Sequence, residues 1–585
     1  MTILPTTLAA RFEPGSNLKD GAAGAAWSFL LPSLELGHVL CLGEPPETSL
    51  ATLARLARAL TVCTDDRRAR DRLAAVADRQ GWREVRIADL DAAGRLAAGS
   101  VDLAWPLTGG YRLHGERLAA FLSPLLSREG LVYLEGRGPR SWRLDGAFLG
   151  ALGRRGAESL LLRLSPAAGE VRSAIPLGDR ATARHLVRRD LAGPLVAAPF
   201  GRVGRRLLER APARGVLDSL AERIVPRAGA IVATHPDPDG ALAAGPPRYL
   251  RRIAAEASID LRGARWGLSA RGRYNSQKVL FVLLGGVEGL VKMTRTPDLG
   301  PRLANESAAL GKLAALGVIG AERAPRLLFH GRHAGLEVVG ESLAGGTPFR
   351  KRSRWTADCP YLADAVEWLA ELGAASVQWA EPNRVAAALG ALLERFSATY
   401  RPTAAEEAFL AAQVQAIAAA DTPFPLVFQH GDPGTWNLIV RPDGRVAFLD
   451  WEAAEPLGMP LWDLFYLLRS FAVSGARAGR IGDPLEAYAR RVLAEAPLGR
   501  LLVDAVGRHC QRIGIARRYV EPLFHLCWMH RALKEATRLE PAALGQGHYL
   551  RLLHLGMARR QAPTLARLFT GRAEGTPRPA GAPAA

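Results

Sequence analysis

Lysine is scarce in this sequence: only six of the 76 basic residues are Lys, and the rest are Arg. The formal net charge is nevertheless +19, a value that raises the question of a nucleic-acid partner. The basic residues are spread along the chain and form neither a dense block nor a basic motif with interleaved aromatic residues. We therefore expect no nucleic-acid partner, and a lysine at a chemically important position stands out.

Cysteine is also scarce. The five cysteines are scattered, odd in number and without a CxxC pair, which argues against a disulfide framework or a zinc site and predicts a cytoplasmic protein. No apolar run reaches the ~18 residues typical of a transmembrane helix. The N-terminus lacks the basic start and apolar core of a signal peptide. Peripheral contact with a membrane and the oligomeric state stay open.

The first ~215 residues alternate between strand-like and helix-like segments. Apolar runs predict strands at 38–43, 60–66, 101–107 and 130–136. Between the first two, apolar residues at three- and four-residue spacing predict a helix over 49–60. Such alternation is typical of a doubly wound parallel sheet with helices on both faces. We therefore predict an α/β fold for this part of the chain.

The remaining sequence divides by composition. Residues 226–247 are rich in Pro and Gly and indicate a linker, which we place at 216–247 after a first domain over 1–215. Residues 248–345 are rich in predicted strands, residues 346–570 are largely helical, and residues 571–585 form a tail that we expect to be disordered. The prediction is thus a multidomain α/β protein.

One stretch, QHGDPGTWNLIVRPDGRVAFLDWE over 429–452, combines acids, an amide and a hairpin signal. Asp443-Gly444 between strand-forming residues predicts a two-residue type I′ turn. That turn pairs Leu438 with Leu449 and sets Asn437 opposite Asp450. An amide oxygen and a carboxylate at that distance are hard ligands that suit Mg²⁺.

The same stretch carries Asp432 five residues before Asn437. An Asp, an Asn five residues later and a further Asp, in that order, are the catalytic base and the metal ligands of protein kinases. Residues 247–567 resemble the aminoglycoside phosphotransferase and choline kinase family, in which Gly stands where protein kinases have Arg, as Gly431 does here. The resemblance implies a bilobal protein-kinase-like fold that uses ATP and Mg²⁺.

The resemblance also implies the rest of the site. Asp432 would be the catalytic base, and Asn437 and Asp450 would bind the metal ion. The residues expected to bind or orient the nucleotide are Lys292 on a strand, Glu306 on the next helix, Asn275 and Ser276 in a phosphate loop, and Glu341 and Ser342 at the adenine. The expected supporting residues of the catalytic loop are His430 and Asp463.

The N-terminal part resembles class I S-adenosylmethionine-dependent methyltransferases in its order of strands. Gly43 stands where the first turn needs a glycine, but Glu44-Pro45-Pro46 replaces the glycines that should follow, and proline fixes φ where glycine freedom is required. Asp65 or Asp66 could bind a ribose. We expect a degenerate Rossmann-like domain that does not bind S-adenosylmethionine and serves docking or substrate presentation.

The function expected is therefore transfer of the ATP γ-phosphate to a hydroxyl of a small molecule or glycan. Two alternatives stay open: a bifunctional kinase–methyltransferase acting on a sugar or polysaccharide, and a non-enzymatic pseudokinase scaffold. From Arg350 onward the chain has 28 basic and 23 acidic residues. A polycationic aminoglycoside would favour an acidic acceptor region, so a neutral or anionic sugar fits this balance better.

Overall fold

The structure is a computed structural model of the 585-residue chain. It describes residues 25–107, 113–136, 145–167, 170–177, 179, 227–235, 241–270, 278–317, 323–478 and 482–571. The described residues fall into two compact units, one from residues up to 304 together with 327–343, the other from 305–326 and from 344 onward. Each unit is considered by itself below.

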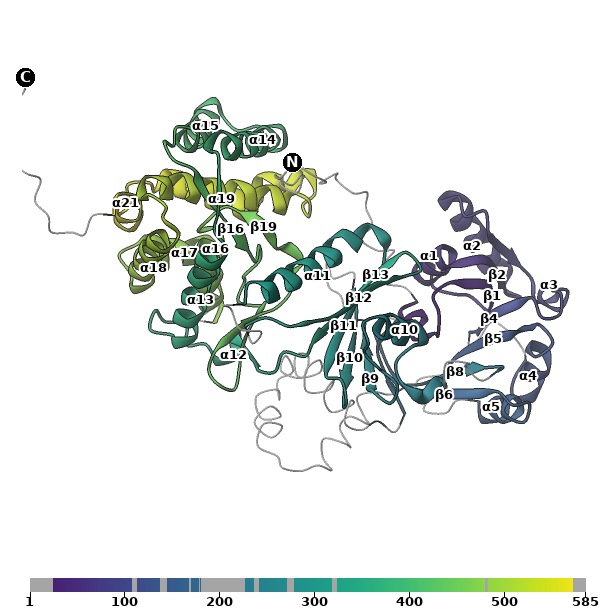
Figure 1. Ribbon diagram of the computed structural model, residues 1–585. Helices are drawn as coiled ribbons and strands as arrows, with labels where there is room; N and C mark the ends of the chain where they lie inside the picture. Colours follow the sequence, from purple (N-terminus) through teal and green to yellow (C-terminus); the bar gives the residue numbers. More distant parts are fainter. Residues whose placement is uncertain are drawn as a thin grey trace, which may run out of the picture. The chain divides into compact units, whose positions relative to one another are not determined.

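The first unit contains a doubly wound parallel sheet, as predicted. Its parallel strands lie in the order β3-β2-β1-β4-β5. Neighbouring residues of β1 point to opposite faces: Val39 and Cys41 enter one hydrophobic core, Leu40 and Leu42 the other. The elements, which Figure 1 shows at the purple end of its colour scale, are β1 (Leu36–Leu42), α1 (Glu47–Leu56), β2 (Ala57–Cys63), α2 (Arg67–Gln80), β3 (Val85–Ala88), α3 (Leu90–Gly94), β4 (Val101–Pro106), α4 (Glu116–Leu122), β5 (Leu126–Glu135) and α5 (Gly146–Gly153).

Two features of this sheet differ from the sequence prediction. The helix predicted over 49–60 ends at Leu56, because Ala57–Cys63 joins the sheet as β2 beside β1. The segment predicted as a linker contains a strand, β8 (Arg227–Ala233), which lies antiparallel between β5 and β6 (Glu158–Ala167). A short apolar run within Pro- and Gly-rich sequence was thus enough to complete the sheet. The predicted domain boundaries themselves stay a prediction.

The strands of the predicted kinase N-lobe continue the same sheet. β7 (Glu170–Pro176) forms a hairpin with β6 and also pairs antiparallel with β9 (Arg265–Ser269) through Ser173–Ser269 and Ala174–Leu268. Beyond β9 the sheet runs through β10 (Lys278–Leu284), β11 (Gly289–Thr294), β13 (Leu336–Ser342) and β12 (Leu327–His333). The helix α10 (Arg248–Glu256) contacts β12. One 13-stranded sheet therefore joins the methyltransferase-like part to the kinase-like strands.

The second unit is mainly helical. Its two small sheets have the strand orders β14-β17-β18 and β15-β16-β19. Their strands are β14 (Thr347–Pro348), β15 (Gln378–Ala380), β16 (Phe424–Gln429), β17 (Leu438–Val440), β18 (Val446–Phe448) and β19 (Glu455–Gly458). The helices, green to yellow in Figure 1, are α12 (Phe349–Arg352), α13 (Pro360–Ser376), α14 (Pro382–Tyr400), α15 (Ala404–Ala418), α16 (Trp462–Ala478), α17 (Pro484–Tyr488), α18 (Pro497–Ile513), α19 (Val520–Ala536), α20 (His548–Ala558) and α21 (Pro563–Thr570). The helix α11 (Gly300–Ala315) begins in the first unit and continues in the second.

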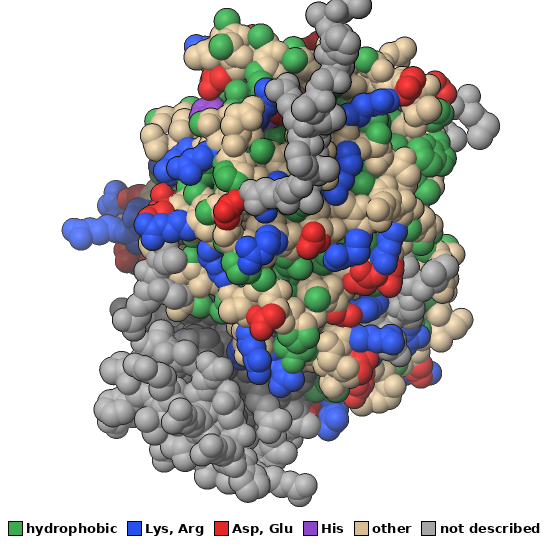
Figure 2. Space-filling view, turned by 90° about the vertical axis from the view of Figure 1, so that its left-hand side faces the viewer, with side chains coloured by type: hydrophobic (Ala, Val, Ile, Leu, Met, Phe, Trp, Pro, Cys, Tyr) green, Lys and Arg blue, Asp and Glu red, His purple; other side chains and the backbone are tan. Residues whose placement is uncertain are grey.

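The fold class is as predicted: an α/β chain with a Rossmann-like sheet of methyltransferase type, followed by a kinase-like region with a β-rich and a helical part. None of the helices in the described ranges is both long enough and apolar enough to cross a membrane. Figure 2 shows basic and acidic side chains side by side over the face that it presents. On that face, basic and acidic residues are thus intermixed rather than separated by sign.

Candidate active site

The hairpin at the centre of 429–452 forms, but its register differs by one residue from the prediction. Leu438 pairs with Phe448 and Val440 with Val446. The loop has three residues: the Gly444 N–H donates to the carbonyl of Arg441, and Gly444 alone among the loop residues has a positive φ, 86°. A type I′ turn needs positive φ at two positions, whereas Pro442 fixes its φ near −65° and favours a type I turn followed by glycine. Asn437 consequently faces Leu449, whose N–H donates to the Asn437 carbonyl over 2.8 Å, rather than Asp450.

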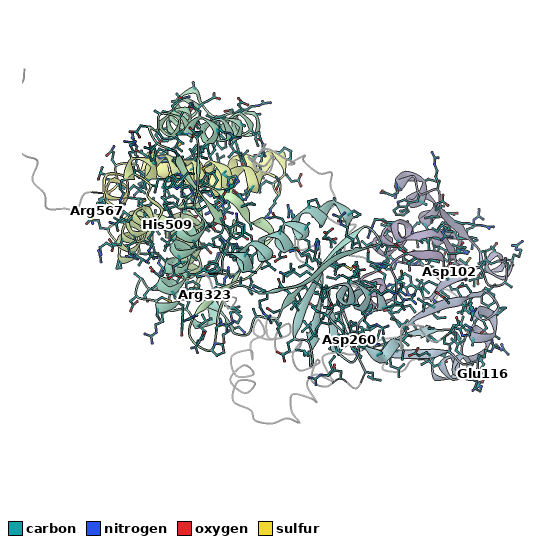
Figure 3. All side chains as sticks on the ribbon, viewed as in Figure 1. Asp102, Glu116, Asp260, Arg323, His509 and Arg567 are labelled. Carbon is teal, nitrogen blue, oxygen red and sulfur yellow. The ribbon has the colours of Figure 1, made fainter. Side chains whose placement is uncertain are left out.

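The outer edge of this hairpin is held by an ion pair that the sequence analysis did not identify. Arg323, labelled in Figure 3, pairs with Asp364 of α13 at 2.5 Å and donates to the carbonyl of Val446 over 3.0 Å. Asp364 also accepts from the Val446 N–H over 2.7 Å. The Phe448 N–H donates to the Arg323 carbonyl over 2.8 Å. Strand β18 therefore has backbone partners on both sides, which fixes the position of the residues that follow it.

The loop before the hairpin is held by Asp463 at the start of α16. The Asp463 carboxylate accepts from the His430 N–H over 2.6 Å and from the Gly431 N–H over 3.1 Å. Burial raises the pKa of this carboxyl, while His430, Arg531 and the two backbone donors act in the opposite direction. The predicted supporting role of Asp463 fits this geometry.

Glycine is required at position 431 for two reasons. Its φ is 76°, and a Cβ placed there would lie 1.9 Å from the carbonyl oxygen of Ala453. No side chain fits at that distance, and a positive φ is costly for other residues. The glycine that marks the family resemblance is therefore needed for the close approach of two backbone segments.

His430 has both ring nitrogens occupied by the backbone. Its Nε2 lies 3.0 Å from the Leu449 carbonyl oxygen, which can only accept, and its Nδ1 lies 3.2 Å from the Asp432 N–H, which can only donate. The ring is fully buried, with its centroid 4.3 Å from that of Trp451. This geometry suits a fixed support of the loop rather than a base.

Asp432 and Asn437 form the chemical centre of the loop. The Asn437 Nδ2 donates to the Asp432 carbonyl over 2.9 Å and to the Asp432 Oδ2 over 3.2 Å. The Trp436 Nε1 makes a longer contact of 3.4 Å with the same Oδ2. Within the described ranges, no hydrogen bond reaches the Asp432 Oδ1 or the Asn437 Oδ1. A carboxylate oxygen and an amide oxygen are thus left to accept a proton and to bind a cation.

Asp450 lies just after β18 in a strained conformation, with φ 66° and ψ 68°. A non-glycine residue with left-handed backbone often marks a functional position. The segment after it is anchored by α11: the fully buried Glu306 accepts from the Trp451 N–H over 3.0 Å, and Asn305 donates to the carbonyls of Glu452 and Ala454 over 3.0 and 2.9 Å. Asn305 was missed from the sequence, although it adjoins Glu306 in the NES motif used to identify that residue.

The predicted nucleotide residues that the structure describes in the first unit lie on the paired strands β11 and β13. Lys292 is buried and its Nζ lies 3.0 Å from the Glu341 Oε1. Ser342 is the last residue of β13 and pairs with Gly289. Glu341 was expected at the adenine, and its side-chain ion pair with Lys292 was not predicted. Asn275 and Ser276 lie outside the described residues. All these roles stay predictions.

At the edge of the parallel sheet, the polar side chains near the Gly43 turn are mostly used by the fold. Gly43 has a φ of 111°, and its N–H donates to the carbonyl of Cys63 over 2.8 Å. Glu44 pairs with Arg72 at 2.6 Å. Asp66 caps α2 by accepting from two backbone N–H groups. Of the two acids proposed for a ribose, only Asp65 keeps an exposed carboxylate without a hydrogen bond inside the described part.

Comparison with known proteins identifies the C-terminal half. Residues 267–498 match the model of a phosphotransferase enzyme family, APH. This range covers about two fifths of the chain and includes every predicted site residue from Asn275 to Asp463. No curated protein matches the chain. Residues 267–498 are thus similar to this family.

Solved structures resemble parts of the chain. Choline kinase LicA from Streptococcus pneumoniae is 14% identical, with a TM-score of 0.32, over 49% of this chain and 92% of its own. An aminoglycoside-3'-phosphotransferase of type VIII is 20% identical, with a TM-score of 0.26, over 44% of this chain and 98% of its own. Geranyl diphosphate C-methyltransferase from Streptomyces coelicolor is 13% identical, with a TM-score of 0.20, over 35% of this chain and 72% of its own.

Proposed function

We propose that the protein transfers the γ-phosphate of ATP to a hydroxyl group of a small molecule or glycan. The observation that carries this proposal is the arrangement of Asp432 and Asn437. The Asn437 amide nitrogen is turned toward Asp432, which orients both residues and leaves one oxygen of each without a hydrogen-bond donor in the described structure. A base and a metal ligand are held in adjacent positions by a single side-chain contact.

The chain's residues fit Mg²⁺ by their donor chemistry. Asn437 offers its Oδ1, and Asp450 offers a carboxylate that is only partly buried, on a backbone fixed by β18 and by the Glu306 bond to Trp451. Both are hard oxygen ligands, and Mg²⁺ usually takes one or two protein ligands together with phosphate oxygens. When bound, Mg²⁺ supplies positive charge that offsets the charge on the phosphates.

In the proposed reaction, Asp432 accepts the proton of the acceptor hydroxyl through its Oδ1. The acceptor oxygen forms a bond to the γ-phosphorus as the bond to the β,γ-bridging oxygen breaks, and ADP leaves. Lys292 would bind the α- and β-phosphates, and Asp463 and His430 hold the loop on which Asp432 is carried. ATP and Mg²⁺ are therefore the cofactors we propose. The cytoplasmic location is a separate proposal, which rests on the scattered cysteines of the sequence.

The N-terminal sheet enters this proposal as a docking or presenting domain. We keep the prediction that it does not bind S-adenosylmethionine, on the grounds of Pro45 and Pro46 after Gly43 and of the helix-capping role of Asp66. The exposed Asp65 is the observation that favours the bifunctional alternative. Calorimetric titration with S-adenosylmethionine tests it, and saturable binding would establish that alternative.

The proposed activity is tested by measuring ADP release from Mg·ATP with a panel of sugars, sugar acids, sugar phosphates, amino alcohols and polysaccharide fragments. We expect release that depends on one class of acceptor and stops when EDTA removes Mg²⁺. Mg·ATP binding without ADP release with any acceptor would favour the pseudokinase scaffold instead.

A further inference from the structure

Arg531 is a buried cation beside the proposed catalytic base that the reaction described above does not use. It lies on α19 and is only 7% exposed. Its guanidinium lies 3.7 Å from the ring centroid of Tyr466 on α16, a cation–π contact. Guanidinium carries five N–H donors, and none of them makes a hydrogen bond within the described residues. The charges of Asp432 and Asp463 act on this cation inside the chain. Guanidinium donors that the fold does not use would suit an oxyanion from outside the chain.

The charge of Asp432 acts directly on this cation. Burial lowers the pKa of Arg531, but Tyr466 and Asp432 raise it, and the net shift is upward. Asp432 likewise contributes to the raised pKa of the Tyr466 hydroxyl, after burial and Tyr549. The rings of Trp436 and Tyr466 connect the two groups in space, because Trp436 contacts the Asp432 carboxylate and meets Tyr466, over which the Arg531 guanidinium lies.

An exposed aromatic ring lies at the same place. Trp436 is 45% exposed, an unusual exposure for a large ring, and its Nε1 contacts the Asp432 Oδ2. Its ring meets that of Tyr466 edge to face, with centroids 6.1 Å apart. The guanidinium of Arg350 on α12 lies over the Trp436 ring at 5.4 Å, while its Nε contacts the Thr435 Oγ1 at 3.4 Å. A flat apolar surface bordered by cations thus adjoins the base.

Further arginines surround this surface. Arg469 donates to the Tyr549 hydroxyl over 3.3 Å, and that hydroxyl lies 3.1 Å from the Tyr466 hydroxyl. Burial and the charges of Arg469, Arg551 and Arg477 lower the pKa of His548 to about 3. Burial and Arg477 also lower the pKa of Arg350. Three arginines, Arg350, Arg469 and Arg531, thus lie over the connected rings of Trp436, Tyr549 and Tyr466 next to Asp432, which favours an anionic molecule.

We infer that the phosphate acceptor carries an oxyanion, a carboxylate or a phosphate, and that Arg531 binds it while Trp436 contacts the carbon skeleton. The inference rests on the proposed function and adds the chemical class of the acceptor to it. Arg531 thereby places the hydroxyl at the Asp432 Oδ1, and the reaction itself is unchanged: the hydroxyl loses its proton to Asp432, gains the γ-phosphoryl group, and ADP leaves.

The test compares acceptors that share hydroxyl groups and differ in charge. Glucose, glucuronate and glucose 6-phosphate are neutral, carboxylate-bearing and phosphate-bearing, and choline is a cationic reference. We expect the anionic acceptors to give the higher kcat/KM, and the two of them to show which oxyanion is preferred. Arg531→Met should raise the KM for the anionic acceptor by about 10- to 100-fold, the loss expected for a charge-assisted contact, and Arg531→Lys should restore part of it.

A matched control separates this effect from general damage. Arg538, exposed just beyond the end of α19, can be changed to Met with the same loss of charge and should leave the KM unchanged. If Arg531 only supports Asp432, Arg531→Met would lower kcat equally for neutral and anionic acceptors, and this result would overturn the inference. Preferred turnover of glucose or choline would also overturn it while leaving the proposed function intact.

Failure of the proposed function is distinguished by an equilibrium measurement. Calorimetric titration with glucose 6-phosphate, and with inorganic phosphate alone, reports on oxyanion binding without turnover. The oxyanion site is supported if the unmodified chain and Arg538→Met bind the anion and Arg531→Met does not. This result would count even if no ADP is released. Binding that is unchanged in Arg531→Met, or undetectable in the unmodified chain, rejects the site.

Discussion

Two turns of this molecule each contain a glycine with a positive φ, but the side chains that follow the glycine have different roles. Gly43 ends the first strand of the parallel sheet with a φ of 111°, and Gly431 begins the loop before the β17–β18 hairpin with a φ of 76°. After Gly43, Glu44 forms a surface ion pair with Arg72, and nearby Asp66 caps a helix. After Gly431, the side chains of Asp432 and Asn437 are oriented against each other, and each keeps an oxygen without a donor in the described structure.

The difference shows what separates a supporting turn from a candidate site. Polar side chains of the first turn either meet partners of the fold or are exposed to water, as Asp65 is. The backbone of the second turn is held by buried contacts. Examples are the hydrogen bonds from the backbone N–H groups of His430 and Gly431 to the Asp463 carboxylate. Fixed acceptors that lack internal donors are suited to a substrate and a metal ion.

The largest expected effect comes from removing the amide oxygen beside the base. Asn437→Ala should lower kcat/KM for phosphate transfer by about 10²- to 10³-fold, because both the proposed metal ligand and the contact that orients Asp432 are lost. ADP release at varied Mg²⁺ concentration measures it. Asn383→Ala, at an exposed position of α14, is the control and should retain full activity. If Asn437→Ala lowered kcat/KM by less than threefold, the loop after Gly431 would contribute no more to the reaction than the turn after Gly43, and the comparison would be wrong.

The second effect is on stability at acid pH and separates the helical unit from the sheet unit. Burial, with a smaller contribution from Arg512, lowers the pKa of His509 to about 4. As the pH falls, His509 is protonated in the unfolded chain before it is protonated in the folded chain. The free energy of unfolding is therefore highest above about pH 6.5 and decreases as the pH falls toward 4. The loss should amount to about 1.4 kcal/mol per pH unit in that window. Hydrogen exchange of α18 against pH, in the unmodified chain and in His509→Gln, measures it; identical slopes would contradict it.

The third effect tests the close approach at Gly431. Gly431→Ala should destabilise the helical unit by roughly 1–3 kcal/mol or more, because the Cβ would meet the Ala453 carbonyl in a backbone conformation that alanine adopts with strain. Gly444→Ala is the matched control: its φ is also positive, 86°, but its Cβ would meet no atom within 4 Å. Equal losses in the two variants, measured by thermal unfolding, would show that positive φ alone matters.

The smallest effect belongs to the first turn. Asp66→Ala removes the cap of α2 and should cost about 1 kcal/mol of stability. Because Asp66 serves only the fold in this account, phosphate transfer should not change. A loss of activity with unchanged thermal stability would show that this edge of the sheet contributes to the reaction.

Much of this arrangement could be predicted from the sequence, and the errors have physical causes. The alternation of strands and helices in the first part of the chain and the presence of a hairpin within 429–452 followed from apolar periodicity and turn residues. The hairpin register did not, because Asp443-Gly444 was given priority over Pro442. Proline has no N–H to donate to Arg445 as the predicted pairing requires, and its fixed φ suits a position inside the loop. The strand β8 was missed because its short apolar run lies among Pro and Gly residues.

Long-range contacts were the least accessible to the sequence. Arg323, Asp364 and Asn305 hold the hairpin and the segment after it, yet none belongs to a spacing pattern with the residues that they contact. Arg531 follows Asp432 by 99 residues in the sequence. The charge of Asp432 acts on Arg531 only because the packing of α19 brings the two residues near each other. Such pairs are set by tertiary packing rather than by local sequence.

The central claim, that Asp432 is the base of a phosphate transfer, is tested most directly by Asp432→Asn. We predict that this variant binds Mg·ATP with unchanged affinity in calorimetry and forms no phosphorylated product detectable by mass spectrometry. Asp443→Asn, the same change at the exposed hairpin loop, should form product at the normal rate. Full product formation by Asp432→Asn would contradict the account.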